Sequence, residues 1–415
     1  MRIPTVTQFQ TQIQLMNAQM LQIQTLQAQA ETGSKIQNSS DDPVLASQIK
    51  AVDDYISSLG NYTINGTLAQ NRYSLFSSSL ETGIDVMDNV RELTQAAQND
   101  TLNNSDRVNL ANELQSDLER MLAIANTQDG NGNYIFSGYN SNVPAFVQQG
   151  GMYQYQGGSE ATSVYISPTI TTTYNESGND VFGKICLGNG EFTVTIPGTN
   201  TGTGVSSAGS ILSTSAYVSD TYTISYVTNS AGNLAYKVVG ANSGQVIPAP
   251  PATVPADAPD YEAGADLTFN GLTVTISGRP NAGDSFQITP STSQNMFNTL
   301  QNMINTLRTP INNAAEQAVF HQNMTQSSAS LYQVTDQLRS YLSGVGSRSA
   351  TVDSQVKTNN ETITNQKIIL GQLADADMAA VTSSLMQQNV ELEATQQIYI
   401  KIQETLFELL KNGTL

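Results

Sequence analysis

Apolar residues recur every seven positions near the C-terminal end of the chain. Two series, three residues apart, follow this spacing: Met378, Leu385, Leu392, Tyr399 and Leu406, and then Val381, Gln388, Thr395, Ile402 and Leu409. Series with this offset are the a and d positions of a heptad, the pattern of helices that pack along a narrow seam. The pattern predicts one helix over residues 378–411, about 50 Å long at 1.5 Å per residue.

The first thirty residues carry a pattern with two interpretations. The stretch FQTQIQL alternates apolar and polar residues, as a half-buried strand would. A heptad is also present, in two series: Val6, Ile13 and Met20, and then Phe9, Met16, Ile23 and Ala30. A strand would need a turn within residues 5–31, and no turn residues occur there. We therefore predict a helix over this stretch.

Further helices are predicted inside these two ends. Residues 43–100 carry apolar residues at helical spacing, and residues 106–126 follow Ser105, a residue suited to cap a helix. Residues 311–370 are also predicted to be helical, with a break at Gly344 and Gly346.

The middle of the chain has a different composition. Residues 130–290 contain 22 of the 30 glycines and 10 of the 13 prolines, which disfavour helices. Short runs such as YTISYV (222–227) and LTVTIS (272–277) predict strands of a compact β domain, whose core we expect Cys186 to join. The proline-rich stretch 246–259 is predicted to be a loop that pairs with no strand.

The predicted fold class is therefore mainly α, with an inserted β-rich domain. Five segments are expected: an N-terminal coiled-coil helix at 1–38, a helical rod at 39–140, a β-rich domain at 141–290, a second part of the rod at 291–373 and a C-terminal coiled-coil helix at 374–415.

The heptad seams at both ends cannot bury themselves alone. One interpretation is that they pack on each other within one chain; another is that they pair and then stack on other copies. The outer faces favour stacking, because they carry Gln, Asn, Ser and Thr rather than Lys and Glu. The large apolar members of the four series, a set that leaves out Ala30, are the candidate assembly interface. We expect both ends to be disordered or frayed in the free monomer.

Charge and rare residues exclude several functions. The formal net charge is −18 and the pI about 4.3, which disfavours binding to nucleic acid or to anionic membranes. One cysteine, Cys186, and one histidine, His321, leave no disulfide pair and no zinc cluster. The sequence shows no apolar run typical of a cleaved secretory signal or a membrane span.

Paired carboxylates are the remaining candidates for chemistry. Asp41 and Asp42 precede Pro43, and Asp375 and Asp377 precede the last predicted helix. Asp at the cap position and proline at the first helical position are favoured at helix starts. We therefore interpret Asp42, Pro43, Ser105 and Asp377 as structural caps, and expect no metal, no cofactor and no catalytic residue.

Four motifs, in this order, resemble one family. They are TGSKIQNSSDDPVLASQI (32–49), NTQDGNGNYIFSGYNSNVPAF (126–146), FNGLTVTISGRPNAGDSFQITP (269–290) and ADADMAAVTSSLMQQNVELEATQQIYIKIQETLFELL (374–410). Together with helices at both ends and a central β insert, they are similar to the hook-associated protein 3 branch of the flagellin superfamily. Residues 160–268 carry no such resemblance.

The resemblance implies a non-enzymatic subunit of the bacterial flagellum. It implies a ring of copies of this chain at the hook–filament junction, with the first hook-associated protein on one face and flagellin on the other. It also implies a flagellar export chaperone and export through the flagellar type III apparatus, without a cleaved signal. The alternatives are flagellin or a minor filament subunit and, less favoured by the terminal heptads, a surface adhesin.

Overall fold

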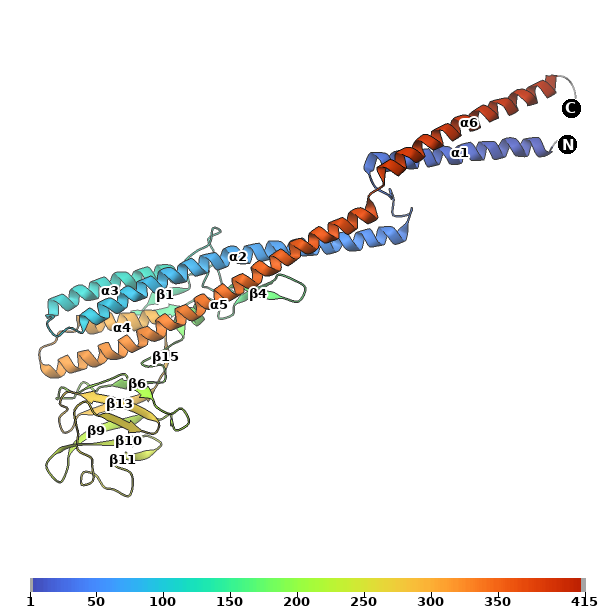
Figure 1. Cartoon of the computed structure of the whole chain (residues 1–415). Helices are drawn as coiled ribbons and strands as arrows, with labels where there is room; N and C mark the ends of the chain where they lie inside the picture. The colour runs from blue at the N-terminus through green and yellow to red at the C-terminus, as the bar shows by residue number, and fades with distance from the viewer. Residues whose placement is uncertain (1–2, 412–415) are drawn as a thin grey trace. The chain divides into compact units, whose positions relative to one another are not determined.

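The computed structural model of the chain describes residues 3–411, with the side chains of 3–6, 406 and 409–411 outside that description (Figure 1). The chain divides into two compact units, residues 1–64 with 355–415 and residues 65–354. Each unit has its own internal packing and is described by itself.

The first unit is helical. It contains α1 (Ile3–Thr32), α6 (Met378–Lys411), the beginning of α2 (Pro43–Ala97) and the end of α5 (Ala314–Ala374). The predicted C-terminal helix has the observed bounds, and the N-terminal segment is helical rather than extended. Helix α1 packs along α6, so the two ends of the chain pair with each other.

The second unit has a helical part made by α2, α3 (Asn104–Ala125), α4 (Met296–Arg308) and α5. Its core contains these fully buried residues: Phe76, Met87, Val90, Leu114, Leu118, Met121, Leu300, Met303, Leu331, Val334 and Leu338. The predicted break at Gly344 and Gly346 was wrong, because α5 continues through both glycines. Val345 between them is buried, and its packing outweighs the cost of about 1 kcal/mol for each glycine.

The start of α3 corrects a second prediction. Asn103, not Ser105, caps this helix: its side-chain oxygen accepts from the backbone N–H groups of Ser105 and Asp106 at 2.8 and 3.0 Å. The Asp106 carboxylate accepts from the backbone N–H of Asn103, which completes a capping box. Ser105 therefore lies in the first turn, where its hydroxyl is not the cap.

Short strands connect the helices to the β domain. They form three two-stranded antiparallel sheets: β1 (Phe146–Gln149) with β2 (Met152–Tyr155), β3 (Thr162–Tyr165) with β4 (Thr171–Asn175), and β5 (Ile185–Cys186) with β15 (Ser293–Gln294). A one-turn π-helix, η1 (Asn179–Gly183), follows β4. The rings of Phe146, Phe182 and Phe297 pack together there.

Cys186 is exposed, so the prediction that it joins a β core was wrong. It is the second residue of the two-residue strand β5, and its neighbour Ile185 is the buried one.

The β domain consists of two antiparallel sheets. Five strands form the order β11–β10–β9–β14–β6, and β12, β13 and β7 form the second sheet, with β8 beside β13. The bounds are β6 Phe192–Thr195, β7 Val205–Ser206, β8 Ser210–Ile211, β9 Tyr222–Thr228, β10 Leu234–Gly240, β11 Gly244–Ile247, β12 Asp266–Phe269, β13 Leu272–Ser277 and β14 Ser285–Pro290. Alternate residues of β9 and β13 are buried, as the sequence pattern predicted.

The proline-rich stretch is partly a strand. Val246 and Ile247 belong to β11, and Ile247 pairs with Val238 of β10, so the prediction that 246–259 pairs with no strand was wrong at its beginning. The Gln245 side chain then fixes the loop, because its amide donates to the carbonyls of Pro248 and Ala252 at 2.8 and 2.9 Å.

Within residues 3–411, no helix combines the length and apolar character needed to cross a membrane.

Candidate assembly interface and internal clamp

The two terminal helices, α1 and α6, pack side by side and antiparallel, and we call this pair the hairpin. The rings of Phe9 and Tyr399 stack with centroids 5.1 Å apart. Near the other end, Ser34 and Asp375 form an antiparallel bridge, reinforced by Lys35 N–H donating to the Ala374 carbonyl at 2.7 Å. These two contacts fix the register of α1 against α6.

Most predicted interface residues line this hairpin. The following are buried or half-buried: Phe9, Met16, Ile23, Val381, Leu385, Leu392, Tyr399 and Ile402. Both predicted series of α6 therefore contribute to its seam with α1. The side chains of Val6, Leu406 and Leu409 lie outside the described residues.

Three predicted residues lie outside the seam. Ile13, Met20 and Met378 are 37%, 48% and 45% exposed. On α1 the half-buried partners of Phe9, Met16 and Ile23 are instead Gln12, Gln19 and Leu26. One facing helix covers a seam only two columns wide, so Ile13 and Met20 remain on the outer side.

Large apolar side chains lie among the polar residues on the outer surface of the hairpin. Its exposed large side chains are Ile13, Leu15, Met20 and Leu21 on α1, and Met378, Met386, Val390, Ile398, Ile400 and Phe407 on α6. The seam, by contrast, contains amides: the side-chain oxygens of Gln19 and Gln388 are buried without a hydrogen-bond partner. Apolar surface that a single hairpin cannot cover is typical of an interaction site.

Carboxylates cap the two helices, α2 and α6, that begin next to the end of the hairpin where Ser34 pairs with Asp375. Asp42 Oδ1 accepts from the N–H groups of Val44 and Leu45 at 3.1 and 3.0 Å, so Asp42 caps α2, and Pro43 is its first residue. Asp377 Oδ1 accepts in the same way from Ala379 and Ala380 at 3.0 and 3.2 Å and caps α6. These caps were predicted correctly.

The neighbouring residues Asp41 and Asp375 also contact the backbone of nearby segments. Asp41 Oδ2 accepts from the N–H groups of Gln37 and Asn38 at 3.1 and 2.8 Å, so it orders the loop before α2. Asp375 lies in the bridge to Ser34. Among residues 3–411, no group of three or more His, Cys, Asp and Glu residues could hold a metal ion.

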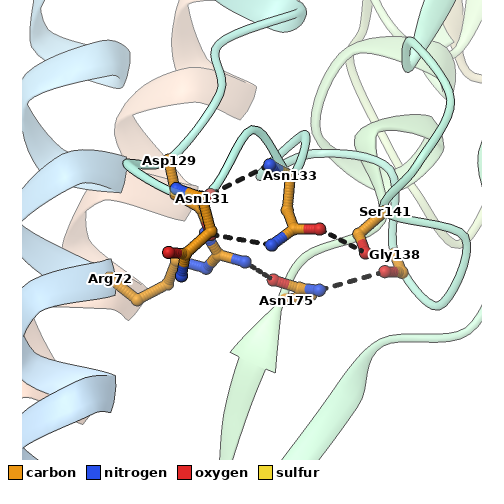
Figure 2. Close-up of polar contacts among 7 residues, drawn as sticks. All are labelled: Arg72, Asp129, Asn131, Asn133, Gly138, Ser141 and Asn175. Atoms are coloured by element: carbon orange, nitrogen blue, oxygen red, sulfur yellow. Dashed lines mark hydrogen bonds and ion pairs between the residues drawn. The ribbon is translucent and has the colours of Figure 1, made fainter.

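A buried arginine organises the second unit. Arg72 on α2 is 5% exposed, and its Nη1 lies 2.8 Å from Asp129 Oδ2. Its Nη2 donates to Asn175 Oδ1 on β4, and Asn175 Nδ2 donates to the Gly138 carbonyl at 3.2 Å (Figure 2). The guanidinium thus connects α2, the loop after α3 and β4, and we call Arg72, Asp129 and Asn175 the arginine clamp.

Asp129 also orders its own loop. Its Oδ1 accepts from the N–H groups of Asn131 and Asn133 at 2.8 and 2.9 Å (Figure 2). Burial would raise the pKa of the Asp129 carboxyl, but these N–H groups and the Arg72 charge outweigh burial and lower the pKa. The carboxylate therefore stays ionised, as a partner of a buried guanidinium must.

A second ion pair lies directly after β4, the strand that carries Asn175. Arg348 Nη2 of α5 contacts the Glu176 carboxylate, which follows Asn175 in the chain. Burial raises the pKa of Glu176, although the Arg348 charge opposes this. The lone histidine is also paired, with His321 Nε2 2.7 Å from Asp100 Oδ1. These pairs connect different elements of the second unit.

Several known proteins are similar to this chain in sequence and fold. Residues 5–141 match the family model of the bacterial flagellin N-terminal helical region. The flagellar hook-associated protein 3 of Escherichia coli (strain K12) is 33% identical over 157 residues, which are 38% of this chain and 49% of that protein. The chain thus matches about half the length of this curated relative.

Two crystal structures from Legionella pneumophila match over nearly their whole length. The flagellar hook associated protein-3 is 33% identical, with a TM-score of 0.75 over 78% of this chain and 98% of that one. The flagellar junction protein FlgL is 34% identical, with a TM-score of 0.69 over 74% of this chain and 99% of that one. The chain belongs to the flagellar hook-associated protein 3 family.

Membership in the hook-associated protein 3 family accounts for the fold and for the motifs that suggested it. The arginine clamp was nevertheless missed by sequence reasoning, although Asp129 and Asn131 lie inside the motif NTQDGNGNYIFSG. The available signal was the spacing Asp–Gly–Asn–Gly–Asn, which is typical of a loop folded around a positive charge. Nothing in the helical pattern of α2 indicated that Arg72 supplies that charge.

Proposed function

We propose that this chain is a structural subunit of the flagellar hook–filament junction, and that many copies assemble through their terminal helices. The observation that carries the proposal is the apolar outer surface of the α1–α6 hairpin, which includes Ile13 and Met20 on α1. Residues of this kind are rarely left uncovered in such number on a free-standing helix pair. A neighbouring copy would cover them.

The proposed interface has two parts with different roles. Seam residues such as Leu392 hold α1 and α6 together within one copy. Outer residues such as Ile13 and Met20 would be buried by the next copy in the ring, each gaining about 25 cal/mol for every Å² of apolar surface removed from water. Both readings of the sequence therefore have a place: the ends pack on each other and also meet other copies.

The partners follow from family membership and belong to the same proposal. The ring would contact the first hook-associated protein on one face and flagellin on the other, and a flagellar chaperone would accompany the chain during export. The protein would lie outside the cell body, in the flagellum. The net charge of −18 disfavours nucleic acid and anionic membranes as partners.

The proposed role needs no enzyme activity. The buried charged pairs, Arg72 with Asp129 and Arg348 with Glu176, connect structural elements to one another. A subunit of this kind works by shape and by surface complementarity, so we propose that the chain is not an enzyme.

The test separates the two parts of the interface. Ile13→Asp with Met20→Asp should remove incorporation into flagella without changing hydrogen exchange in the hairpin, whereas Leu392→Asp should remove incorporation and speed that exchange, with the β domain intact in both. Gln14→Asp, which adds a charge on an exposed polar position of α1, is the matched control. Immunoelectron microscopy of hooks and hydrogen exchange of the purified chains are the measurements.

Two results would argue against this proposal. Normal incorporation of the Ile13→Asp, Met20→Asp chain would show that the outer surface is not the interface. A purified flagellum in which this chain is the dominant protein would favour the alternative, a filament subunit, because a junction subunit is scarce.

A further inference from the structure

The β domain has a core of its own. Its buried residues, including Phe192, Ile224, Val274 and Phe286, all come from strands between 192 and 288. The chain enters the domain at Leu187 and leaves it at Ser291, and these two residues are joined by a hydrogen bond from Ser291 Oγ to the Leu187 carbonyl at 2.8 Å. The domain is thus attached through one paired connection.

Helix α5 contacts this domain through polar side chains. Gln322 Nε2 donates to the Val194 carbonyl at 3.0 Å, and its Oε1 accepts from Ser206 N–H at 2.7 Å. Gln326 Oε1 accepts from Val194 N–H at 3.3 Å. Val194 lies on β6, an edge strand of the five-stranded sheet, so α5 glutamines satisfy the edge that would otherwise be open.

The same face of α5 continues this pattern toward the domain's connection. Ser330 Oγ accepts from Gly188 N–H at 2.9 Å, and Gln333 Nε2 donates to the Asn189 carbonyl at 3.2 Å. We call Gln322, Gln326, Ser330 and Gln333 the polar ladder. In each of its bonds to the β domain the partner atom is main-chain.

The other face of α5 is different in kind. Met324, Leu331, Val334 and Leu338 are fully buried in the helical core. One helix therefore holds the helical core by apolar packing and holds the β domain by hydrogen bonds. Separating the first contact exposes apolar surface to water, whereas the bonds of the second can be replaced by bonds to water.

Clefts lie beside the polar ladder. One of about 970 Å³ is lined by residues 198–201 and by the segment from Thr309 to Phe320. Another of about 420 Å³ is lined mainly by uncharged polar groups, among them Thr193, Asn302 and Asn323. The side-chain nitrogen of Gln326, in the wall of the second cleft, is buried without a partner. The junction is thus neither closely packed nor fully hydrogen-bonded.

From this arrangement we propose that the polar ladder is a release latch: the β domain detaches from α5 as a folded unit, pivoting on its connection at 187 and 291, while the helical core remains intact. The latch holds main-chain atoms, so it depends on the position of the edge strand and not on the identity of its side chains. The proposal does not depend on the assembly function.

The direct test weakens the latch without changing the helix. Gln322→Leu, Gln326→Leu and Gln333→Leu, combined, should speed hydrogen exchange in peptides covering 188–206 by about tenfold or more, with exchange in β9 and α3 changed less than twofold. Gln301→Leu, on α4, whose amide bonds only to the side chain of Asn305, is the matched control and should leave both unchanged. Unchanged exchange at 188–206 in the triple variant would overturn the proposal, and so would equal acceleration in β9, which would mean unfolding rather than release.

A distance measurement checks the motion itself. Spin labels on cysteines replacing Leu212 in the β domain and Val108 on α3, both exposed, with Cys186→Ser, report the separation of the domain from the helical core. In the triple variant we expect a second, longer distance population, absent from the Gln301→Leu chain. A single unchanged distance in the triple variant would show that the β domain does not detach.

Discussion

The terminal hairpin and the β domain bury their apolar residues in opposite ways. In the β domain, the residues of the two sheets face each other and every core side chain is at most 6% exposed. In the hairpin, seam residues such as Met16 and Leu392 stay half-buried, amides share the seam, and large apolar residues face outward. The β domain is complete by itself, whereas the hairpin is complete only with further partners.

The apolar surface available for association therefore lies on the hairpin and not in the β core. Both regions have comparable apolar content, but only a two-layer sheet arrangement encloses it. Two helices have one seam, and any apolar column beside that seam remains in water. The outer column of Ile13 and Met20 is the clearest instance.

The largest effect should come from the β core. Phe286→Ala removes a fully buried ring and should lower the free energy of unfolding of the β domain by about 3–5 kcal/mol. Met16→Ala in the half-buried seam should cost roughly 1 kcal/mol in the hairpin, because that side chain is only partly buried. Hydrogen exchange resolved by peptide measures both, and equal costs would remove the contrast between the two regions.

The arginine clamp should come next. Arg72→Met removes the partner of a half-buried carboxylate and should destabilise the second unit by about 3 kcal/mol. Double replacement of Arg72 by Met and Asp129 by Asn should recover part of this loss, since no uncompensated charge then remains. Denaturant unfolding followed by circular dichroism tests the pair, and additive losses in the double variant would contradict a coupled clamp.

The N-terminal cap of α3 should make Asn103 and Ser105 differ in their effect on stability. Asn103→Ala removes the acceptor for two N–H groups of α3 and should cost about 1 kcal/mol. Ser105→Ala is the matched control, with an expected change near zero, because Ser105 only donates its backbone N–H to that cap. Thermal unfolding of the two variants side by side gives the comparison, and an equal loss for both would restore Ser105 as a cap.

Acid should affect the β domain through Asp220. Burial would raise the pKa of this carboxyl, but hydrogen bonds from Ser243, Asn242 and Thr221 outweigh burial and lower the pKa to about 2. A lowered pKa means that its stabilisation is complete above the ordinary value of 3.8 and is lost as pH falls toward 2. Melting of wild type and Asp220→Asn between pH 5 and pH 2 should converge at the acid end, and a constant difference would disprove the assignment.

Much of the fold could be predicted from the sequence. Heptad spacing gave α6 its bounds, and the concentration of glycine and proline placed the β insert, because both signals act locally on the backbone. Asp42, Pro43 and Asp377 were recognisable as caps for the same reason. Local patterns also misled: Asn103 competed with Ser105 for the cap, and Cys186 was assigned to a core from its neighbours alone.

The remaining features required the folded chain. Which heptad column of α1 faces α6 depends on the register set by Phe9 with Tyr399 and by Ser34 with Asp375, contacts between residues more than three hundred positions apart. The pairing of Arg72 with Asp129 and of α5 glutamines with the β6 backbone is equally non-local. The sequence by itself determined most of the helices and strands, since these follow from neighbouring residues. The tertiary structure decided which apolar and polar faces are covered, because burial depends on what another part of the chain brings against them.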